Sequence, residues 1–84
     1  MVSRLEEIAH QLDTLRVPRL HKLNFIDFAK IVVPVSPLPP IETVEEFLTV
    51  VRQCQHWCAE HELNEQLARL ETIVERFYAN CNLN

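Results

Sequence analysis

The chain has 84 residues, of which 48% are hydrophobic and none is glycine, and its formal net charge is −4. A chain of this length forms one domain with a small core. The absence of glycine excludes phosphate-binding loops, dinucleotide-binding fingerprints and nucleophile elbows, because each needs glycine where the backbone turns sharply or approaches a phosphate. Tight two-residue hairpins are disfavoured for the same reason, so we expect an all-α protein.

The first predicted helix spans about residues 4–16. Ser3 and Glu6 form the S-x-x-E pattern of a capping box at its start. Apolar residues then recur at helical spacing from Leu5 to Leu15. Pro18 stops or kinks this helix, because the residue before a proline is pushed away from helical backbone angles.

Residues 17–33 allow more than one interpretation. Pro18 is compatible with the first position of a second helix, whereas Asn24 is a plausible cap for a shorter one. The β-branched end of the run from Phe25 to Val33 is also compatible with a strand, although no partner strand is evident. We therefore predict a short, largely buried helix at about 25–33.

Residues 34–41 form the one clear linker, because they contain Pro34, Pro37, Pro39 and Pro40. Such a segment is expected to be extended and stiff. It separates an N-terminal helical half, residues 1–33, from a C-terminal half, residues 42–84. Each half is too small to be a domain, so residues 1–84 are predicted to form a single helical domain.

The C-terminal half predicts an antiparallel helical hairpin. Thr43 and Glu46 form a second capping box, which opens a helix at about 44–61. Asn64 is a plausible cap for the next helix, at about 65–81. The apolar positions of both helices step by three and four residues, as one helix face requires: Val44, Phe47, Val51, Cys54, Cys58 and His61, then Leu67, Leu70, Val74, Phe77 and Cys81.

These two stripes mirror each other about Asn64. The mirror places Val51 opposite Phe77, and Phe47 opposite Cys81. The stripes have further apolar flanks, so the hairpin needs a cover. The N-terminal half can supply it with Leu5, Ile8, Leu12, Phe25 and Phe28. We expect a small three- to four-helix bundle built on the C-terminal hairpin, with a dimer that shares the apolar surface as the alternative.

Cys54, Cys58 and His61 are the densest group of reactive side chains, and thiolate and imidazole groups are good zinc ligands. The obvious fourth ligand, Cys81, is expected opposite Phe47, about 10 Å along the helix from Cys54, which is too far for one ion. Packing as small apolar side chains explains the cysteines without metal. We therefore expect no metal and no cofactor, and keep a metal- or thiol-dependent protein that uses these three residues as the alternative function.

The charge is unevenly distributed: residues 1–41 carry net +1 and residues 42–84 carry net −5. Nucleic acid binding needs a basic surface. The only candidate is a weak cluster of Arg16, Arg19, His21 and Lys22, for which solvated surface or pairing with acidic residues is the favoured interpretation. A nucleic-acid-binding regulator is therefore the weakest of the three functions, and nucleic acid is not an expected partner.

We expect no enzyme, because the sequence offers no clear catalytic arrangement and no small-molecule substrate. The favoured function is a non-catalytic interaction module (an adaptor, regulator or chaperone-like subunit) that binds a protein partner or a second copy through an apolar helix face. Apolar and aromatic residues on or beside the surplus face are the candidates for that contact: Trp57, Tyr78, Val50, Ile73, Phe25 and Phe28.

No segment approaches the ~20 apolar residues that span a bilayer, and the first residues lack the apolar core of a signal peptide. The three cysteines offer no even disulfide framework. Free thiols are typical of a reducing compartment, so we expect a cytoplasmic protein with no membrane contact.

Overall fold

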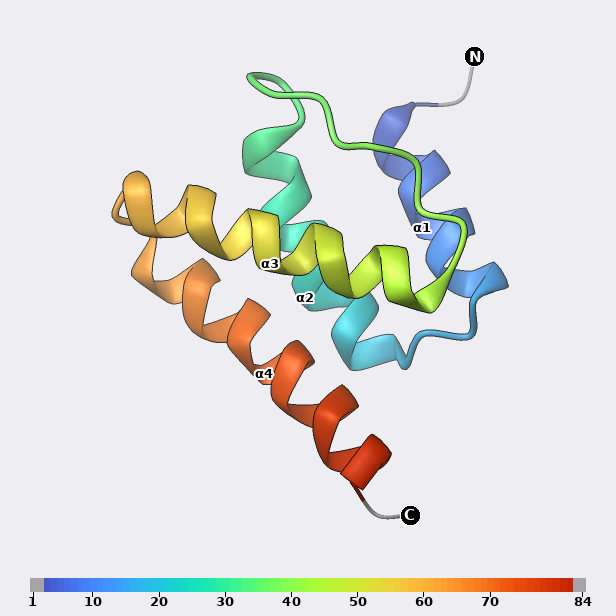
Figure 1. Ribbon diagram of the computed structural model, residues 1–84. Coiled ribbons are helices and arrows are strands. Elements are labelled where there is room, and N and C mark those ends of the chain that lie inside the picture. Colours follow the sequence, from blue (N-terminus) through green and yellow to red (C-terminus); the bar gives the residue numbers. More distant parts are fainter. Residues whose placement is uncertain (1–2, 83–84) are drawn as a thin grey trace.

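The computed structural model describes the backbone of residues 3–82 and the side chains of residues 3–77. Within residues 3–82 the chain forms four helices and no strand: α1 (Arg4–Thr14), α2 (Arg19–Val32), α3 (Val44–Glu60) and α4 (Asn64–Asn82). The helices α3 and α4 form a hairpin, α2 passes behind α3, and α1 packs beside α2 (Figure 1). The expected all-α class and small helical bundle are confirmed.

Both predicted capping boxes start a helix. The Glu6 N–H donates to Ser3 Oγ over 3.1 Å at the start of α1. The Glu46 N–H donates to Thr43 Oγ1 over 3.0 Å at the start of α3. At α4 the Leu67 N–H donates to the Leu63 carbonyl, so this helix begins at Asn64 itself, one residue before the expected start.

The helix expected at 25–33 is longer than predicted and begins at Arg19. Pro18 stands immediately before it with φ at −53°, and its carbonyl accepts the first helical hydrogen bond from the Lys22 N–H at 2.9 Å. Proline suits this place because its fixed φ is already close to the helical value. The alternative in which Pro18 opens a second helix is therefore the better one, and the strand is excluded.

The helices α1 and α3 end in the same way although the chain has no glycine. Arg16 and Glu62 adopt left-handed backbone angles, with φ at 59° and 58°. Each lies in a Schellman motif, in which the next N–H reaches back to a carbonyl of the last helical turn. These bonds are Val17 N–H to Leu12 O at 3.0 Å and Leu63 N–H to Cys58 O at 2.9 Å. The first motif ends α1 at Thr14, two residues before the expected end.

The proline-rich segment 34–41, which we call the strap, runs from the end of α2 across the molecule to the start of α3 (Figure 1). Arg4 on α1 holds it: its Nη2 donates to the carbonyls of Leu38 and Pro39, each over 2.9 Å. Ile41, at the end of the strap, is buried in the core. The strap therefore belongs to the folded body and closes one side of it.

The core draws side chains from all four helices and the strap. The expected cover is confirmed, because Ile8, Leu12, Phe25 and Phe28 are buried and Leu5 packs against them. Aromatic rings join the layers: Phe25 lies 5.3 Å from Phe47, and Phe28 lies 5.9 Å from Trp57, between ring centroids. These edge-to-face contacts fasten α2 to α3.

Candidate interaction surface

Four of the residues expected to bind a partner are inside the core. Val50, Ile73, Phe25 and Phe28 are all buried against other parts of the same chain. They therefore do not lie on the surface of the folded chain. The side chain of Tyr78, a fifth candidate, lies outside the described residues.

Trp57 is half-buried and is held from two sides. Its ring meets the Phe28 ring edge-on, and it also stacks on the His61 ring, with 3.9 Å between ring centroids and an interplanar angle of 16°. His61 Nδ1 also lies 2.8 Å from the Trp57 carbonyl oxygen. Trp57 thus packs against the core near the end of α3, and the His61 ring stacked on it is exposed to solvent.

The candidate metal ligands are not brought together. Cys54 and Cys58 are buried in the core, whereas His61 is exposed and stacked on Trp57. Burial, and then the neighbouring Cys58, raise the pKa of Cys54 to about 12, and burial also raises the pKa of Cys58. Across the described residues no group of three or more His, Cys, Asp or Glu side chains is placed to hold a metal ion.

The predicted basic cluster is also divided. His21 is buried against Phe77, with 5.6 Å between ring centroids, and Lys22 pairs with Asp13 over 2.9 Å. Burial, and then the charge of Arg76, lower the pKa of His21. Arg16 closes α1, and Arg19 opens α2. The four residues therefore do not form one basic surface: Lys22 is in an ion pair, His21 is in the core, and Arg16 and Arg19 are exposed.

The largest exposed apolar side chains on a helix lie on the outer face of α2. Leu20 is 59% exposed, Leu23 is 46% exposed and Ile31 is 38% exposed. The steps 20, 23, 27 and 31 follow the helical repeat, so these three residues and Asp27 share one face. We call this set the α2 face. The opposite side of α2 is buried, so this helix presents apolar residues in both directions.

One ion pair anchors the α2 face to α4. The Asp27 carboxylate accepts from Arg69 Nη1 on α4 at 2.8 Å, and Arg69 Nη2 donates to Glu65 at 2.9 Å. Lys30 Nζ lies 4.0 Å from the same Asp27 carboxylate. The apolar residues of this face are therefore carried on a helix that is tied to the rest of the bundle.

Sequence reasoning missed the α2 face because it began the second helix at residue 25. Leu20 and Leu23 then lay in a segment whose structure was not decided, so they were not assigned to a helix face. The available signal was Pro18, since a helix that starts directly after it places Leu20, Leu23 and Ile31 on one side.

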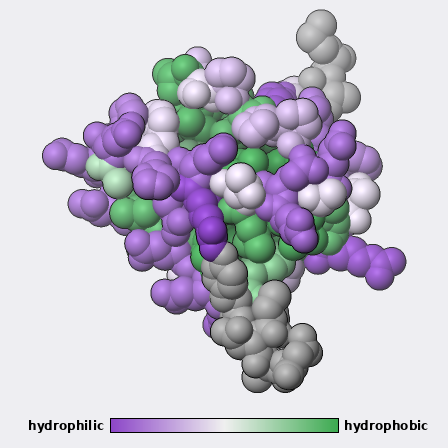
Figure 2. Space-filling view, in the orientation of Figure 1, coloured by the Kyte–Doolittle hydropathy of each residue, from purple (hydrophilic) through white to green (hydrophobic). Residues whose placement is uncertain are grey.

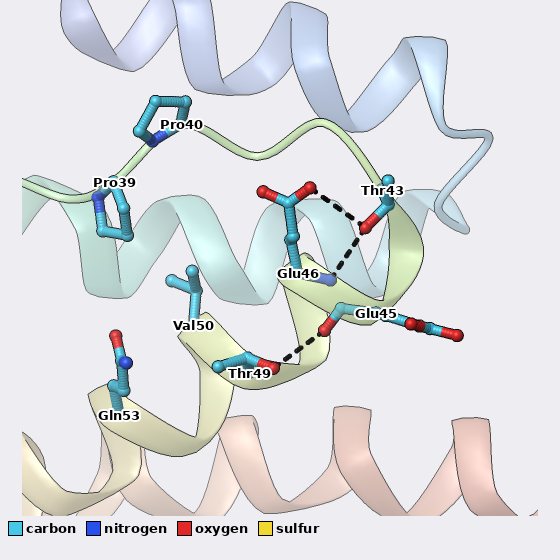
Figure 3. A pocket seen from close by; sticks show the side chains of 8 residues that line it. All are labelled: Pro39, Pro40, Thr43, Glu45, Glu46, Thr49, Val50 and Gln53. Carbon is cyan, nitrogen blue, oxygen red and sulfur yellow. Dashed lines mark hydrogen bonds between the residues drawn. The ribbon is translucent and has the colours of Figure 1, made fainter.

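The surface formed by α3, α4 and the strap is a further place for a candidate site. The face formed by α3 and α4 carries mostly hydrophilic side chains with separate apolar areas between them (Figure 2). A groove of about 570 Å³ lies between the strap and α3 (Figure 3). Its wall includes Pro39 and Pro40, with Val50 and Gln53 across from them.

The polar groups of this groove already serve α3. Thr43 Oγ1 lies 3.3 Å from a Glu46 carboxylate oxygen, Thr49 Oγ1 donates to the Glu45 carbonyl, and the Glu45 carboxylate points away from the groove (Figure 3). Glutamates in a first turn are expected from the helix dipole. The side chains of Thr43, Glu46 and Thr49 therefore serve the first turns of α3.

No helix among the described residues is long and apolar enough to cross a membrane. Comparison of the chain with protein-family models, with curated proteins and with solved structures found no match.

Proposed function

We propose that this protein is a non-catalytic helical interaction module that binds a partner protein on the α2 face. One observation carries the proposal: Leu20, Leu23 and Ile31 are exposed together on one side of a helix whose other side is buried in the core. Single exposed apolar residues are ordinary on a protein surface, but three on one helix face form a contact area.

The size of this contact favours a reversible complex. Full burial of a leucine or isoleucine side chain contributes about 2 kcal/mol, and these three are roughly half exposed, so their burial contributes about 3 kcal/mol together. Association has to overcome a loss of translational and rotational freedom of at least about 4 kcal/mol. Further contacts at the rim are needed, as in a transient adaptor or regulator.

Cys54 and Cys58 support a non-catalytic function, whereas the side chain of Cys81 lies outside the described residues. A thiol attacks as the thiolate, and a pKa of about 12 leaves Cys54 protonated at neutral pH. Its neighbour Cys58 is buried as well. The imidazole of His61 is stacked on Trp57 and is exposed, so it does not share the buried environment of the two thiols.

Comparative capture from cell extract tests this proposal. Four forms of the whole chain serve as bait in separate experiments. They are the wild type, the two α2 variants Leu23→Ser and Ile31→Ser, and the control Val44→Ser. Val44 on α3 is 37% exposed, matching Ile31, but is not on α2. We expect a protein that the wild type and Val44→Ser retain in a stoichiometric complex, and that both α2 variants lose.

The solution mass of the purified complex then distinguishes a heteromeric complex from a second copy of the chain. If the retained proteins are the same for the wild type and both α2 variants, with folding verified by circular dichroism, the α2 face is not the binding site and the proposed function is wrong.

A further inference from the structure

We infer that the partner presents an acidic amphipathic helix to the α2 face. The inference rests on the proposed function and specifies the chemistry of its partner. It follows from the charge around the α2 face and from the kind of secondary structure available there.

The segment that carries the α2 face is basic in an acidic protein. Residues 16–32 hold four basic side chains and one acidic side chain, net +3, whereas the other residues hold four basic and eleven acidic ones, net −7. Arg16 and Arg19 are exposed, and the Lys30 side chain is 63% exposed. These groups attract an acidic partner and steer its approach.

The one acidic residue of that segment, Asp27, is already included in the net charge of +3. The Asp27 carboxylate is engaged by Arg69 at 2.8 Å, with Lys30 at 4.0 Å. Lys22 is engaged by Asp13 on α1. The basic groups that the helical repeat places beside Leu23 at the edge of the α2 face are therefore Arg19 and Lys30. Lys30 lies at the long limit of its ion pair with Asp27, and glutamate or aspartate side chains of a partner are the complement of both groups.

The available binding mode is helix against helix. Residues 3–82 contain no strand, so no sheet edge exists there for an extended peptide to join. The α2 helix has 14 residues, about 21 Å in length, and its apolar residues follow one face. A partner helix with apolar residues at three- and four-residue steps matches this pattern.

The same charges disfavour a second copy bound face to face. Two α2 faces in contact would bring Arg19 and Lys30 of one protomer near the same residues of the other. Like charges at an interface rim oppose association. The solution mass of the free protein checks this directly, with a monomer expected, whereas a dimer that Leu23→Ser dissociates would overturn the inference.

Two synthetic peptides of about 18 residues test the inference, since that length spans α2. Both carry leucine at alternating steps of three and four, and glutamate occupies the other positions in one peptide and lysine in the second. A single-stranded DNA oligonucleotide supplies anionic charge without an apolar face. Fluorescence anisotropy of each labelled probe is measured against the whole chain at up to about 1 mM protein, at low and at high salt.

We expect the glutamate peptide to bind, at least about tenfold more tightly than the lysine peptide and the oligonucleotide. Leu23→Ser weakens its binding about tenfold, and Val44→Ser does not. The double variant Arg19→Gln/Lys30→Gln weakens it about fivefold at low salt and less at high salt, because salt screens exposed charges. The control double variant Gln53→Glu/His56→Glu makes the same change in net charge on α3 and leaves binding within about twofold.

Equal binding of the two peptides, with loss on Leu23→Ser, overturns the acidic partner and leaves the α2 face as a docking site. Absence of binding by the glutamate peptide, or insensitivity to Leu23→Ser, overturns the inference, and the capture experiment then decides the proposed function separately. Binding of the oligonucleotide as tightly as the glutamate peptide also overturns it, in favour of nucleic acid.

Discussion

The ring of Phe47 on α3 meets the ring of Phe77 on α4 edge-on, with 6.0 Å between their centroids and an interplanar angle of 68°. Phe47 also lies 5.3 Å from Phe25 on α2. One fully buried side chain thus joins three of the helices. Because the hairpin covers α2 through this contact, the stability of the whole bundle depends on it.

Phe47→Ala is expected to lower the free energy of unfolding by about 3–4 kcal/mol, because it removes a buried ring and leaves a cavity. Phe47→Leu keeps most of the volume and is expected to cost less than about 1.5 kcal/mol. Urea unfolding followed by circular dichroism measures both. The control Leu20→Ala, at an exposed position, is expected to stay within about 0.5 kcal/mol of the wild type. Equal effects of Phe47→Ala and Leu20→Ala would contradict the packing described here.

Glycine at the two left-handed positions is expected to stabilise the protein. Arg16→Gly and Glu62→Gly each relieve the side-chain crowding of a positive φ, which outweighs the larger entropy of glycine in the unfolded chain. The expected gain is about 0.5–1 kcal/mol for each, measured by urea unfolding. The matched control is Glu60→Gly in the last turn of α3, which is expected to lose about 1 kcal/mol. The Schellman geometry is refuted should glycine at residue 62 destabilise as much as at residue 60.

His21 is expected to make stability depend on pH. Burial first, and Arg76 second, place its pKa in the folded chain below the ordinary 6.5. The unfolded chain therefore binds this proton more readily, so the contribution of His21 is fully present above pH 6.5 and is lost as the pH falls from 6.5 through the lowered pKa. The buried Nδ1, which has no hydrogen-bond partner among the described residues, agrees with a neutral ring.

Unfolding free energies measured between about pH 5 and pH 8 for the wild type and His21→Phe check this prediction. The difference between the two proteins is expected to change below pH 6.5, with the wild type losing more stability on acidification. Arg76→Gln removes the second cause and is expected to reduce the loss. Parallel pH profiles for the wild type and His21→Phe would rule out a role for His21.

Cys54 and Cys58 are expected to resist alkylation in the folded protein. Burial raises the pKa of both, to about 12 for Cys54, so about one part in ten thousand of Cys54 is thiolate at pH 8. Iodoacetamide labelling, mapped by mass spectrometry of the peptides, measures each site with and without urea. Rapid labelling of Cys54 in the absence of urea would show that the thiol reaches solvent.

The local signals in the sequence identified much of the fold. Ser3 and Thr43 indicated where two helices start, because a hydroxyl that accepts from the third N–H is a local interaction. The mirrored apolar stripes indicated the hairpin. The ends of α1 and α3 were harder to predict, since Arg16 and Glu62 take a conformation that usually selects glycine.

Pro18 was a local signal for the start of α2, but Asn24 offered a second start, and the sequence did not decide between them. Residues 17–24 hold no strong helical pattern of their own, and the first turns of α2 are stabilised by contacts with other helices. Lys22 pairs with Asp13 on α1, and His21 packs against Phe77 on α4. Such contacts between distant residues cannot be read from the sequence. For this reason the sequence did not place Leu20 and Leu23 on a helix face.

The sequence by itself determined that the described residues, 3–82, form helices without strands and that residues 44–82 turn back near Asn64, because caps and apolar periodicity act between neighbours in the chain. Only the tertiary structure decided which apolar face is covered. Val50 and Phe28 were equally plausible as surface, but both are buried in the core, whereas Leu20, Leu23 and Ile31 on α2 stay exposed. The physical reason is that burial of any apolar side chain lowers the free energy of the folded chain, so hydrophobicity alone does not select among them. The packing of segments that are distant in the sequence selects which side chains are buried.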